Sequence, residues 1–295
     1  MKNIDYLKKN GVDLNKCLEL FGDVETYNET LKGFNKSVDG KLKQIDKFYK
    51  DEDMPNYAIF VHSLKSDCKY FGFMKLANIA FEHEMASKGN DITFVKEHYQ
   101  ELLDETNKVK TVVNEYLMDE DGTKNLYSDL QPTKEEQPKK EEKKRAEEKI
   151  EEPIKTVKAD SLEEPDVMLE DIILVADDSE VVRVFVEKVF DEKYEIARAC
   201  DGLEALNIIK EHEKDNKIKA ILLDLNMPKL DGFAVLDYMT ETDLLKKMPV
   251  TIISGDSSKE AISKAFTYDI VDMLNKPFSE QKIKETVEKT MNYHL

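Results

Sequence analysis

One segment divides this chain more decisively than any other feature. From Gln131 to Asp166 the sequence has no aromatic residue and consists largely of Glu, Lys and Pro, so it cannot bury a hydrophobic core. We therefore predict a charged and disordered linker at residues 119–169, between folded units at residues 1–118 and 170–295. A structured helical arm is the alternative for the linker. A chain of 295 residues is long enough for two domains of ordinary size.

The overall charge limits the classes of partner. A net charge of -18 and a pI near 4.9 argue against direct binding of nucleic acid, which needs a basic surface. No apolar run reaches about 18 residues, so membrane insertion is not expected either. The chain has 3 cysteines, far apart and without metal-ligand spacing, as expected of free thiols in a reducing compartment. These observations together predict a cytoplasmic protein.

Before the linker, apolar residues recur at helical spacing, and strand-like alternation is nearly absent. Such a pattern is typical of amphipathic helices that bury one face. We therefore expect five or six helices in an all-α bundle. The apolar positions include Leu14, Leu18, Phe21, Leu31, Phe34, Ile45, Phe60, Leu64, Leu76, Leu102 and Val109.

After the linker, short apolar runs alternate with amphipathic stretches. This alternation predicts a doubly wound α/β unit, with a five-stranded parallel sheet and helices on both faces. The predicted strands are Ile172–Ala176, Tyr194–Ala199, Ala220–Leu223, Val250–Ile253 and Val271–Leu274.

Three carboxylates follow two of these predicted strands. Asp177 and Asp178 come after the first strand and Asp224 after the third. Ligands of doubly wound sheets bind beyond the carboxyl ends of the strands, so these side chains are expected to meet there. Three adjacent carboxylates are costly without a cation, and oxygen ligands of this kind suit Mg²⁺.

Two further residues follow the remaining strands. Ser254 ends the fourth, where its hydroxyl can donate to a phosphoryl oxygen. Lys276 follows the fifth, where its charge can pair with a phosphoryl group and a cis bond to Pro277 would fix its position. Each element has a plainer explanation as a helix cap or a turn. Their joint occurrence at four strand ends favours a phosphoryl site.

With these residues in place, residues 170–295 resemble a response-regulator receiver domain of flavodoxin-like fold. The resemblance implies that Asp224 is the phosphoacceptor and that the backbone carbonyl of Asn226 joins Asp177 and Asp178 as a magnesium ligand. It also implies that Ser254 and Lys276 contact the phosphoryl group. Such a domain would supply most of the catalysis of its own phosphorylation and dephosphorylation.

One position departs from the family pattern. Three residues before Lys276, similar receivers usually carry an aromatic side chain that moves on phosphorylation, and here the residue is Met273. Methionine is flexible and apolar, so inward packing stays open to it, but a tyrosine hydroxyl is lost. We expect the output surface to switch weakly or differently, while phosphoacceptance is unaffected.

A second candidate acceptor lies before the linker. On a helix, Lys65, Ser66 and Lys69 share the face of His62, which makes that face small and positive. Such a face would attract phosphate, and an exposed histidine with a pKa of roughly 6.5 offers a neutral ring nitrogen near pH 7. Taken alone, a histidine beside lysines is more often a solvated surface residue.

The surrounding pattern favours the functional interpretation. His62, Leu64 and Lys65, followed by Gly72 and Glu84, are similar to a histidine-containing phosphotransfer (HPt) domain. The upstream Leu20-Phe-Gly-Asp run, with Tyr27, Leu31 and Phe34, agrees with this resemblance. It covers about residues 10–118. Ser66 replaces the usual glycine after Lys65 and slightly raises crowding around a phosphoryl group.

Together, the two resemblances imply a two-component phosphorelay protein. His62 would accept and donate phosphoryl groups, and Asp224 would accept them with Mg²⁺. No glycine-rich ATP-binding region is found, so we expect no ATP-dependent kinase domain. The chain also stops soon after the last predicted helix, so we expect no DNA-binding output domain. The expected partners are a sensor histidine kinase and other receiver or HPt proteins.

Two alternatives remain, a phosphorylation-gated interaction scaffold and a phosphate sink. The sequence leaves open the direction of phosphoryl flow, the regulated process and a dimer through the helices. It also leaves open whether His62 and Asp224 exchange phosphate within one chain.

Overall fold

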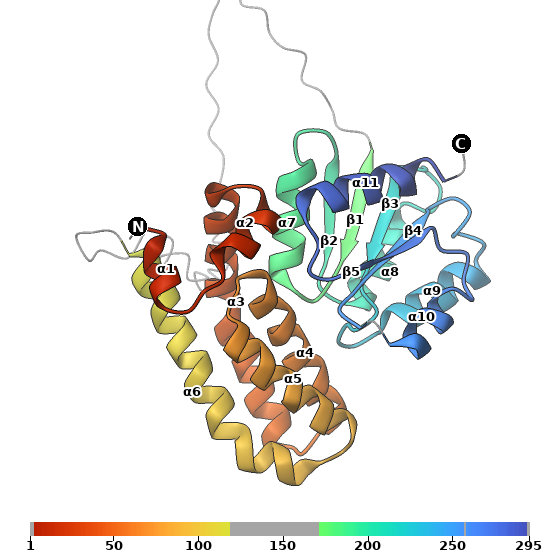
Figure 1. Ribbon diagram of the computed structural model, residues 1–295. Helices are drawn as coiled ribbons and strands as arrows, with labels where there is room; N and C mark the ends of the chain where they lie inside the picture. The colour runs from red at the N-terminus through yellow and green to blue at the C-terminus, as the bar shows by residue number, and fades with distance from the viewer. Residues whose placement is uncertain (1–2, 119–170, 257, 294–295) are drawn as a thin grey trace, which may run out of the picture.

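The structure is a computed structural model that describes residues 3–118, 171–256 and 258–293. Its N-terminal unit is helical throughout, as predicted (Figure 1). The helices are α1 (Asp5–Lys9), α2 (Leu14–Phe21), α3 (Val24–Lys50), α4 (Met54–Tyr70), α5 (Met74–Lys88) and α6 (Ile92–Leu117). The predicted linker lies outside the described residues.

Local sequence signals set where these helices begin. Asp13, Asp23, Asp53 and Asp91 precede α2, α3, α4 and α6, and each side chain accepts a hydrogen bond from a backbone N–H of the first turn. Such caps satisfy donors that a helix start would otherwise leave unpaired. Between α4 and α5 the chain turns at Gly72, whose φ of +73° places it in the left-handed region that favours glycine.

The C-terminal unit is a five-stranded parallel sheet in the order β2-β1-β3-β4-β5, which confirms the predicted α/β class. The strands are β1 (Ile172–Ala176), β2 (Glu195–Ala199), β3 (Ile218–Leu223), β4 (Val250–Ser254) and β5 (Asp272–Asn275). The helices are α7 (Glu180–Phe190), α8 (Gly202–Glu211), α9 (Gly232–Glu241), α10 (Lys259–Ala265) and α11 (Glu280–Met291).

Side chains of the sheet alternate between two hydrophobic cores. From β1, Ile173 and Val175 pack with α7 and α11, whereas Ile172 and Leu174 pack with α8 and α9 on the other face. This alternation follows from the two-residue period of a strand. The core on the α7 and α11 side is continuous with the core of the helical bundle.

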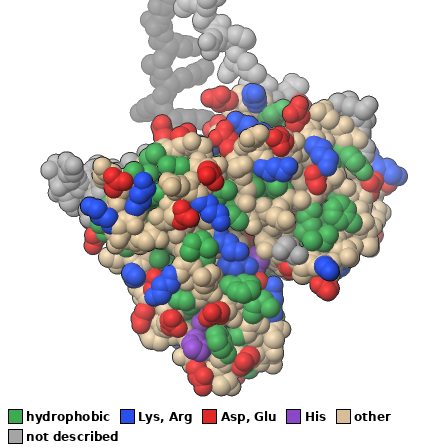
Figure 2. Space-filling view, in the orientation of Figure 1, with side chains coloured by type: hydrophobic (Ala, Val, Ile, Leu, Met, Phe, Trp, Pro, Cys, Tyr) green, Lys and Arg blue, Asp and Glu red, His purple; other side chains and the backbone are tan. Residues whose placement is uncertain are grey.

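The two units therefore pack against each other, with α3 of the bundle alongside α7 (Figure 1). An aromatic contact joins them: the Phe21 and Phe185 rings meet edge to face, with centroids 5.1 Å apart. Nearer the solvent, Lys188 pairs with Glu29 at 2.5 Å. Figure 2 shows acidic and basic side chains interspersed over the visible face of both units. Among the described residues, no helix has the length and apolar character needed to cross a bilayer.

Candidate functional site

Three carboxylates meet at the carboxyl edge of the sheet. β1 and β3 are neighbouring parallel strands, and Asp177, Asp178 and Asp224 follow them directly. Ligand oxygens of the three side chains lie within 4.8 Å of one another. Asp177 and Asp224 are fully buried. The sequence prediction that these residues converge agrees with this geometry.

A buried lysine lies against two of these carboxylates. Lys276 Nζ is 2.5 Å from Asp177 Oδ2 and 2.5 Å from Asp224 Oδ2. Burial would lower the pKa of this ammonium group, but Asp177 and Asp224 raise it well above its usual value. Lys276 is therefore charged, and the bond to Pro277 is cis, as expected.

The carboxylate group still carries excess negative charge. Burial raises the pKa of Asp177 to about 7, with Asp224 and Asp178 acting in the same direction and Lys276 against it. Burial also raises the pKa of Asp178. Lys41 lowers the Asp178 pKa but is itself paired with Asp67. The ammonium groups thus do not neutralise the three carboxylates, and the oxygen donor set suits a hard divalent cation.

The remaining predicted residues surround this group. Ser254 is buried at the end of β4, where its Oγ accepts a hydrogen bond from Asp256 N at 3.0 Å. Asn226 N donates to Asp224 Oδ1 at 3.1 Å. Met273 lies on β5, half-buried against the core shared with α8 and α9. Asn226 thus contacts the carboxylate site directly, Ser254 ends the neighbouring strand, and Met273 lies on β5, which β4 separates from β3.

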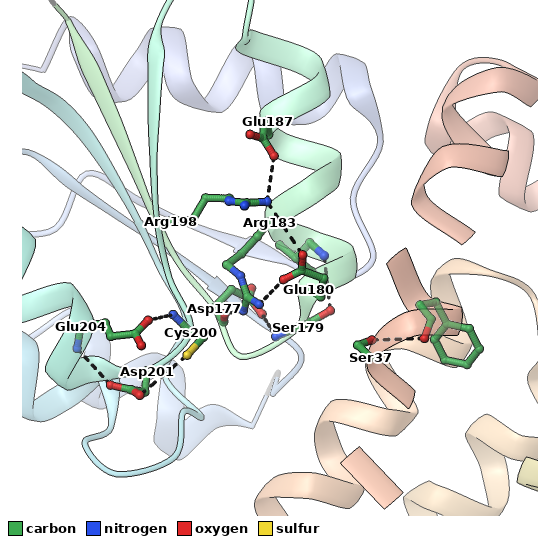
Figure 3. Close-up of polar contacts among 12 residues, drawn as sticks. Ser37, Asp177, Ser179, Glu180, Arg183, Glu187, Arg198, Cys200, Asp201 and Glu204 are labelled. Carbon is green, nitrogen blue, oxygen red and sulfur yellow. Dashed lines mark hydrogen bonds and ion pairs between the residues drawn. The ribbon is translucent and has the colours of Figure 1, made fainter. Parts of the chain in front are cut away.

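A network of charges fixes the start of α7 beside the carboxylates (Figure 3). Arg183 donates to the Asp177 carbonyl and pairs with Glu180, while Arg198 lies 2.9 Å from Glu187. Figure 3 also shows a second acidic group, Cys200, Asp201 and Glu204. Its members are already engaged: Asp201 caps α8, and Glu204 accepts from the Cys200 N–H.

His62 lies in the middle of α4 and differs from the sequence expectation of an exposed ring. Its exposed fraction is only 2%. Nδ1 lies 2.7 Å from Glu84 Oε1 on α5 and 3.2 Å from Lys65 Nζ. One nitrogen cannot donate to the first and accept from the second. The shorter contact to a carboxylate places the proton on Nδ1, which leaves the lone pair on Nε2.

Glu84 has a role at this site that the sequence did not indicate. Besides His62, it accepts from Lys65 at 2.6 Å and from Lys88 at 2.7 Å. Burial alone would raise the Glu84 pKa, but hydrogen bonding and charge from His62 and Lys65 hold it well below its usual value. Glu84 lies on α5 and His62 on α4, so no periodicity within one helix relates the two residues. Only the family resemblance could have indicated that they lie together.

The predicted companions of His62 divide into two groups. Lys65 and Ser66 are each 4% exposed and lie beside the ring. Lys69 is half-buried one turn further along α4. Burial and the charge of Lys65 lower the Lys69 pKa. Lys65 forms an ion pair with Glu84 and does not belong to an open phosphate-binding face.

The unprotonated nitrogen of His62 faces the α/β unit. Nε2 is buried without a hydrogen-bond partner among the described residues. A β-carbon added to Gly255, just after β4, would lie 3.0 Å from Nε2 and 3.3 Å from Ser66 Oγ. A cleft of about 280 Å³ is lined by His62 of the bundle and by Asn226, two residues after Asp224.

A polar chain that sequence analysis missed joins the two sites. Lys41 Nζ on α3 lies 2.5 Å from Asp67 Oδ2 and donates to Ser63 Oγ at 2.6 Å. Asp67 Oδ1 in turn accepts from Ser179 Oγ at 2.5 Å, directly after Asp178. These residues are distant in sequence and carry no motif, so no signal in the sequence could have paired them.

Comparison with known proteins identifies the α/β unit. Residues 173–288 match the family model described as response regulator receiver domain. Probable methanogenesis regulatory protein FilR2 of Methanothrix harundinacea is 31% identical over 131 residues, covering 42% of this chain and 83% of that protein. Sporulation initiation phosphotransferase F of Bacillus subtilis is 28% identical over 123 residues, covering 41% and 94%.

The matched segment spans about half of a larger relative, the probable C4-dicarboxylate response regulator DctR of Priestia megaterium, at 53% of its length. Among solved structures, a receiver domain of Francisella response regulator 1452 is 29% identical and covers 42% of this chain and 99% of that chain, with a TM-score of 0.38. Each of the three relatives, and the Francisella receiver domain, matches less than half of the present chain.

Proposed function

This chain belongs to the response regulator receiver domain family through residues 173–288, and on this premise we propose that it is a two-component phosphorelay protein with two phosphoacceptors. Asp224 is the acceptor of the receiver, and His62 is the acceptor of the helical bundle, which acts as an HPt domain. Sensor histidine kinases and other receiver or HPt proteins are the proposed exchange partners.

One observation carries the assignment of His62. Its Nε2 atom is buried and lacks a hydrogen-bond partner among the described residues, although leaving a buried polar atom unpaired is costly. At the same time Nδ1 is held by Glu84. A ring with one nitrogen fixed and the other kept unpaired beside a receiver is the arrangement that a nucleophile needs.

On the receiver side, the Asp224 carboxylate is the nucleophile. Asp177, Asp178 and Asp224, with the Asn226 carbonyl, would hold Mg²⁺, which when bound would neutralise charge on the phosphoryl oxygens. Lys276 contacts Asp224 directly and is placed to pair with a phosphoryl oxygen as the new bond forms. Ser254 ends β4, the strand beside β3, and we assign its hydroxyl as a donor to the same group.

On the bundle side, Glu84 orients His62 and stabilises the charge of the ring. When Nε2 carries a phosphoryl group, the proton on Nδ1 makes the ring cationic, and the Glu84 carboxylate compensates for that charge. Lys65 and Lys88 keep Glu84 ionised. The bundle thus prepares the nucleophile with its own residues.

The test is to locate the phosphoryl group. Purified protein would be treated with acetyl phosphate or a phosphorylated kinase partner, and the label would be sorted by its lability to acid and to base. We expect an acid-labile, base-stable label that disappears in His62→Ala and a base-labile label that disappears in Asp224→Ala. His212→Ala, a partly exposed histidine on the receiver, is the control.

Label on neither residue would overturn the proposal. Rapid hydrolysis of the label on Asp224, together with no phosphorylation of His62 by any donor, would instead favour the phosphate sink.

A further inference from the structure

We propose that His62 and Asp224 exchange a phosphoryl group directly within one chain, through the interface at which the bundle covers the receiver. The sequence left this question open. The inference rests on the proposed function, because it needs both residues to be phosphoacceptors, but it is a separate claim about the route of transfer.

The first argument is the direction in which His62 faces. The added Gly255 β-carbon would meet both Nε2 and Cε1 of His62, at 3.0 Å and 3.3 Å. Gly255 directly follows Ser254, and Asn226 lines the same cleft as His62. The nucleophilic atom of one unit therefore points at the two loops that carry the phosphoryl-binding residues of the other.

The second argument is that the polar contacts of the interface lie beside the reacting residues. Asp67 Oδ1 accepts from Ser179, which caps α7 next to the carboxylates. Tyr70 Oη accepts from the backbone N–H of Phe278, two residues after Lys276. Both bundle residues lie on α4, the helix of His62, so the docking contacts fix His62 relative to Asp224.

The third argument is the apolar anchor. Phe21 and Tyr70 of the bundle pack on Phe185 and Phe278 of the receiver, with ring centroids between 5.1 Å and 6.3 Å. All four side chains are at most 3% exposed. Buried aromatic clusters of this kind dominate the energy of protein interfaces. This cluster holds the receiver docked on its own bundle in the structure.

Docking also limits access from outside. With His62 only 2% exposed and the α7 face covered, a second receiver has no route to Nε2 in this arrangement. Exchange with other proteins then requires the units to separate, whereas exchange between His62 and Asp224 does not.

The transfer balances without an added reactant. The bond between phosphorus and Nε2 of phosphorylated His62 breaks, and a bond between phosphorus and a carboxylate oxygen of Asp224 forms. The ring keeps the electron pair of the broken bond and becomes neutral, since its Nδ1 proton stays in the bond to Glu84. The reverse step returns the group to Nε2, so the exchange moves no proton.

The decisive experiment compares exchange in one chain with exchange between two. Asp224 would be labelled with radioactive acetyl phosphate, the donor removed, and the appearance of acid-labile label on His62 followed over time. In the unmodified chain we expect a first-order rate that does not change between about 1 and 100 μM protein. Linked partners behave as if present at roughly millimolar concentration.

A mixture of two variants supplies the comparison. Labelled His62→Ala chain, mixed with Asp224→Ala chain, can exchange only between molecules. At about 1 μM we expect this exchange to be at least ~100-fold slower and to rise linearly with concentration. Equal rates in the two experiments, or a concentration-dependent rate in the unmodified chain, would overturn the proposal. Absence of any label on His62 from every donor would instead count against the proposed function.

Two interface variants test the geometry itself. Phe185→Ala removes the anchor, so in-chain exchange should fall about tenfold or more while acetyl phosphate still labels Asp224. Phe190→Ala is the matched control, because Phe190 lies on the same helix but packs on Tyr194 of the receiver. Gly255→Val places a side chain against His62 and should slow exchange without removing the anchor. In-chain exchange that survived both Phe185→Ala and Gly255→Val would contradict the proposed route.

Discussion

The two proposed phosphoacceptor sites have opposite charge balances. Around Asp224, Lys276 contacts Asp177 and Asp224, and Lys41 acts on Asp178 while it pairs with Asp67, so three carboxylates leave negative charge in excess. Around His62, one carboxylate, Glu84, contacts Lys65, Lys88 and the ring, so positive charge is in excess. The sites lie on two units that face each other across one interface.

This difference explains what each site needs. Under the proposed function, the receiver site would need an added cation before it accepts a dianionic phosphoryl group, because its own carboxylates repel that group. The bundle site carries its cations as fixed side chains and needs none. Under the proposed function, a phosphoryl group on His62 would be compensated by protein charge alone, whereas one on Asp224 would require Mg²⁺.

Removing Lys41 is expected to have the largest effect, because this residue lies where the two charge patterns meet. The side chains of Lys41 and Asp67 are 8% and 1% exposed. Lys41→Met would leave the Asp67 carboxylate buried without its counterion, next to the loop that carries Asp178. We expect a loss of about 3–5 kcal/mol in the free energy of unfolding, measured by urea denaturation.

The double variant Lys41→Met/Asp67→Asn separates charge from packing. It removes both charges and should recover most of the lost stability, because an uncharged side chain in place of Asp67 no longer needs a counterion. If the double variant were as unstable as Lys41→Met, the cause would be lost packing and not unpaired charge.

Changing Glu84 should have the next largest effect. We expect that effect to be limited to the site around His62. Glu84→Ala removes the acceptor that fixes the Nδ1 proton of His62, so we expect phosphorylation of His62 to slow by about 10²-fold. Glu84→Gln keeps an oxygen that can accept from Nδ1 and should lose less. Labelling of Asp224 by acetyl phosphate should be unchanged in both.

Glu105→Ala is the matched control for Glu84→Ala. Glu105 is also largely buried and paired with two lysines, Lys75 and Lys108, but it lies on α6 away from His62. An equal loss of His62 phosphorylation in this variant would show a general effect on the bundle.

The two sites also differ in how far the sequence predicted them. The receiver residues each follow a strand, and parallel strands bring their carboxyl ends to one edge, so a pattern along the chain implied a place in space. Asp177 and Asp224 lie together for this reason. The bundle offered only one helical face, on which His62, Lys65 and Ser66 could be grouped.

What the sequence could not predict depends on packing between elements. Glu84 contacts His62 because α4 and α5 pack side by side, at a sequence separation of 22 residues. The contact of Gly255 with His62 crosses the interface between units, and no periodic pattern encodes such a contact. The expectation of an exposed His62 was wrong for the same reason: the sequence gives no sign that a second unit covers α4.

The pH dependence of metal binding provides a smaller, third test and concerns the negative site alone. The pKa of Asp177 is raised to about 7, so its metal-free carboxyl group binds a proton below that pH. A metal ion must displace this proton, and metal affinity therefore falls as pH falls. Between pH 8 and pH 6 we expect Mg²⁺ affinity to drop about tenfold, measured by calorimetry.

The same raised pKa predicts the direction in which Asp177 changes the stability of the metal-free protein as pH rises. The folded state holds the Asp177 proton more tightly than the unfolded state does, so the contribution of this group to stability is fully present below the ordinary aspartate pKa and is lost as pH rises through about 7. Saturating Mg²⁺ should reduce this decline. Metal affinity that was equal at pH 6 and pH 8 would contradict the excess of negative charge at the receiver site.

The smallest effect is expected for the ion pair at the rim of the interface. Lys188 on α7 lies 2.5 Å from Glu29 on α3, but the two side chains are 43% and 37% exposed. Water and salt screen such a pair, so Lys188→Ala should change the free energy of unfolding by less than about 1 kcal/mol. In-chain exchange should slow by no more than about fivefold, and the difference should vanish in about 0.5 M salt, because at that ionic strength screening acts over only a few ångströms. A loss as large as that of Phe185→Ala would mean that charge at the rim, and not the aromatic anchor, holds the negative and positive sites together.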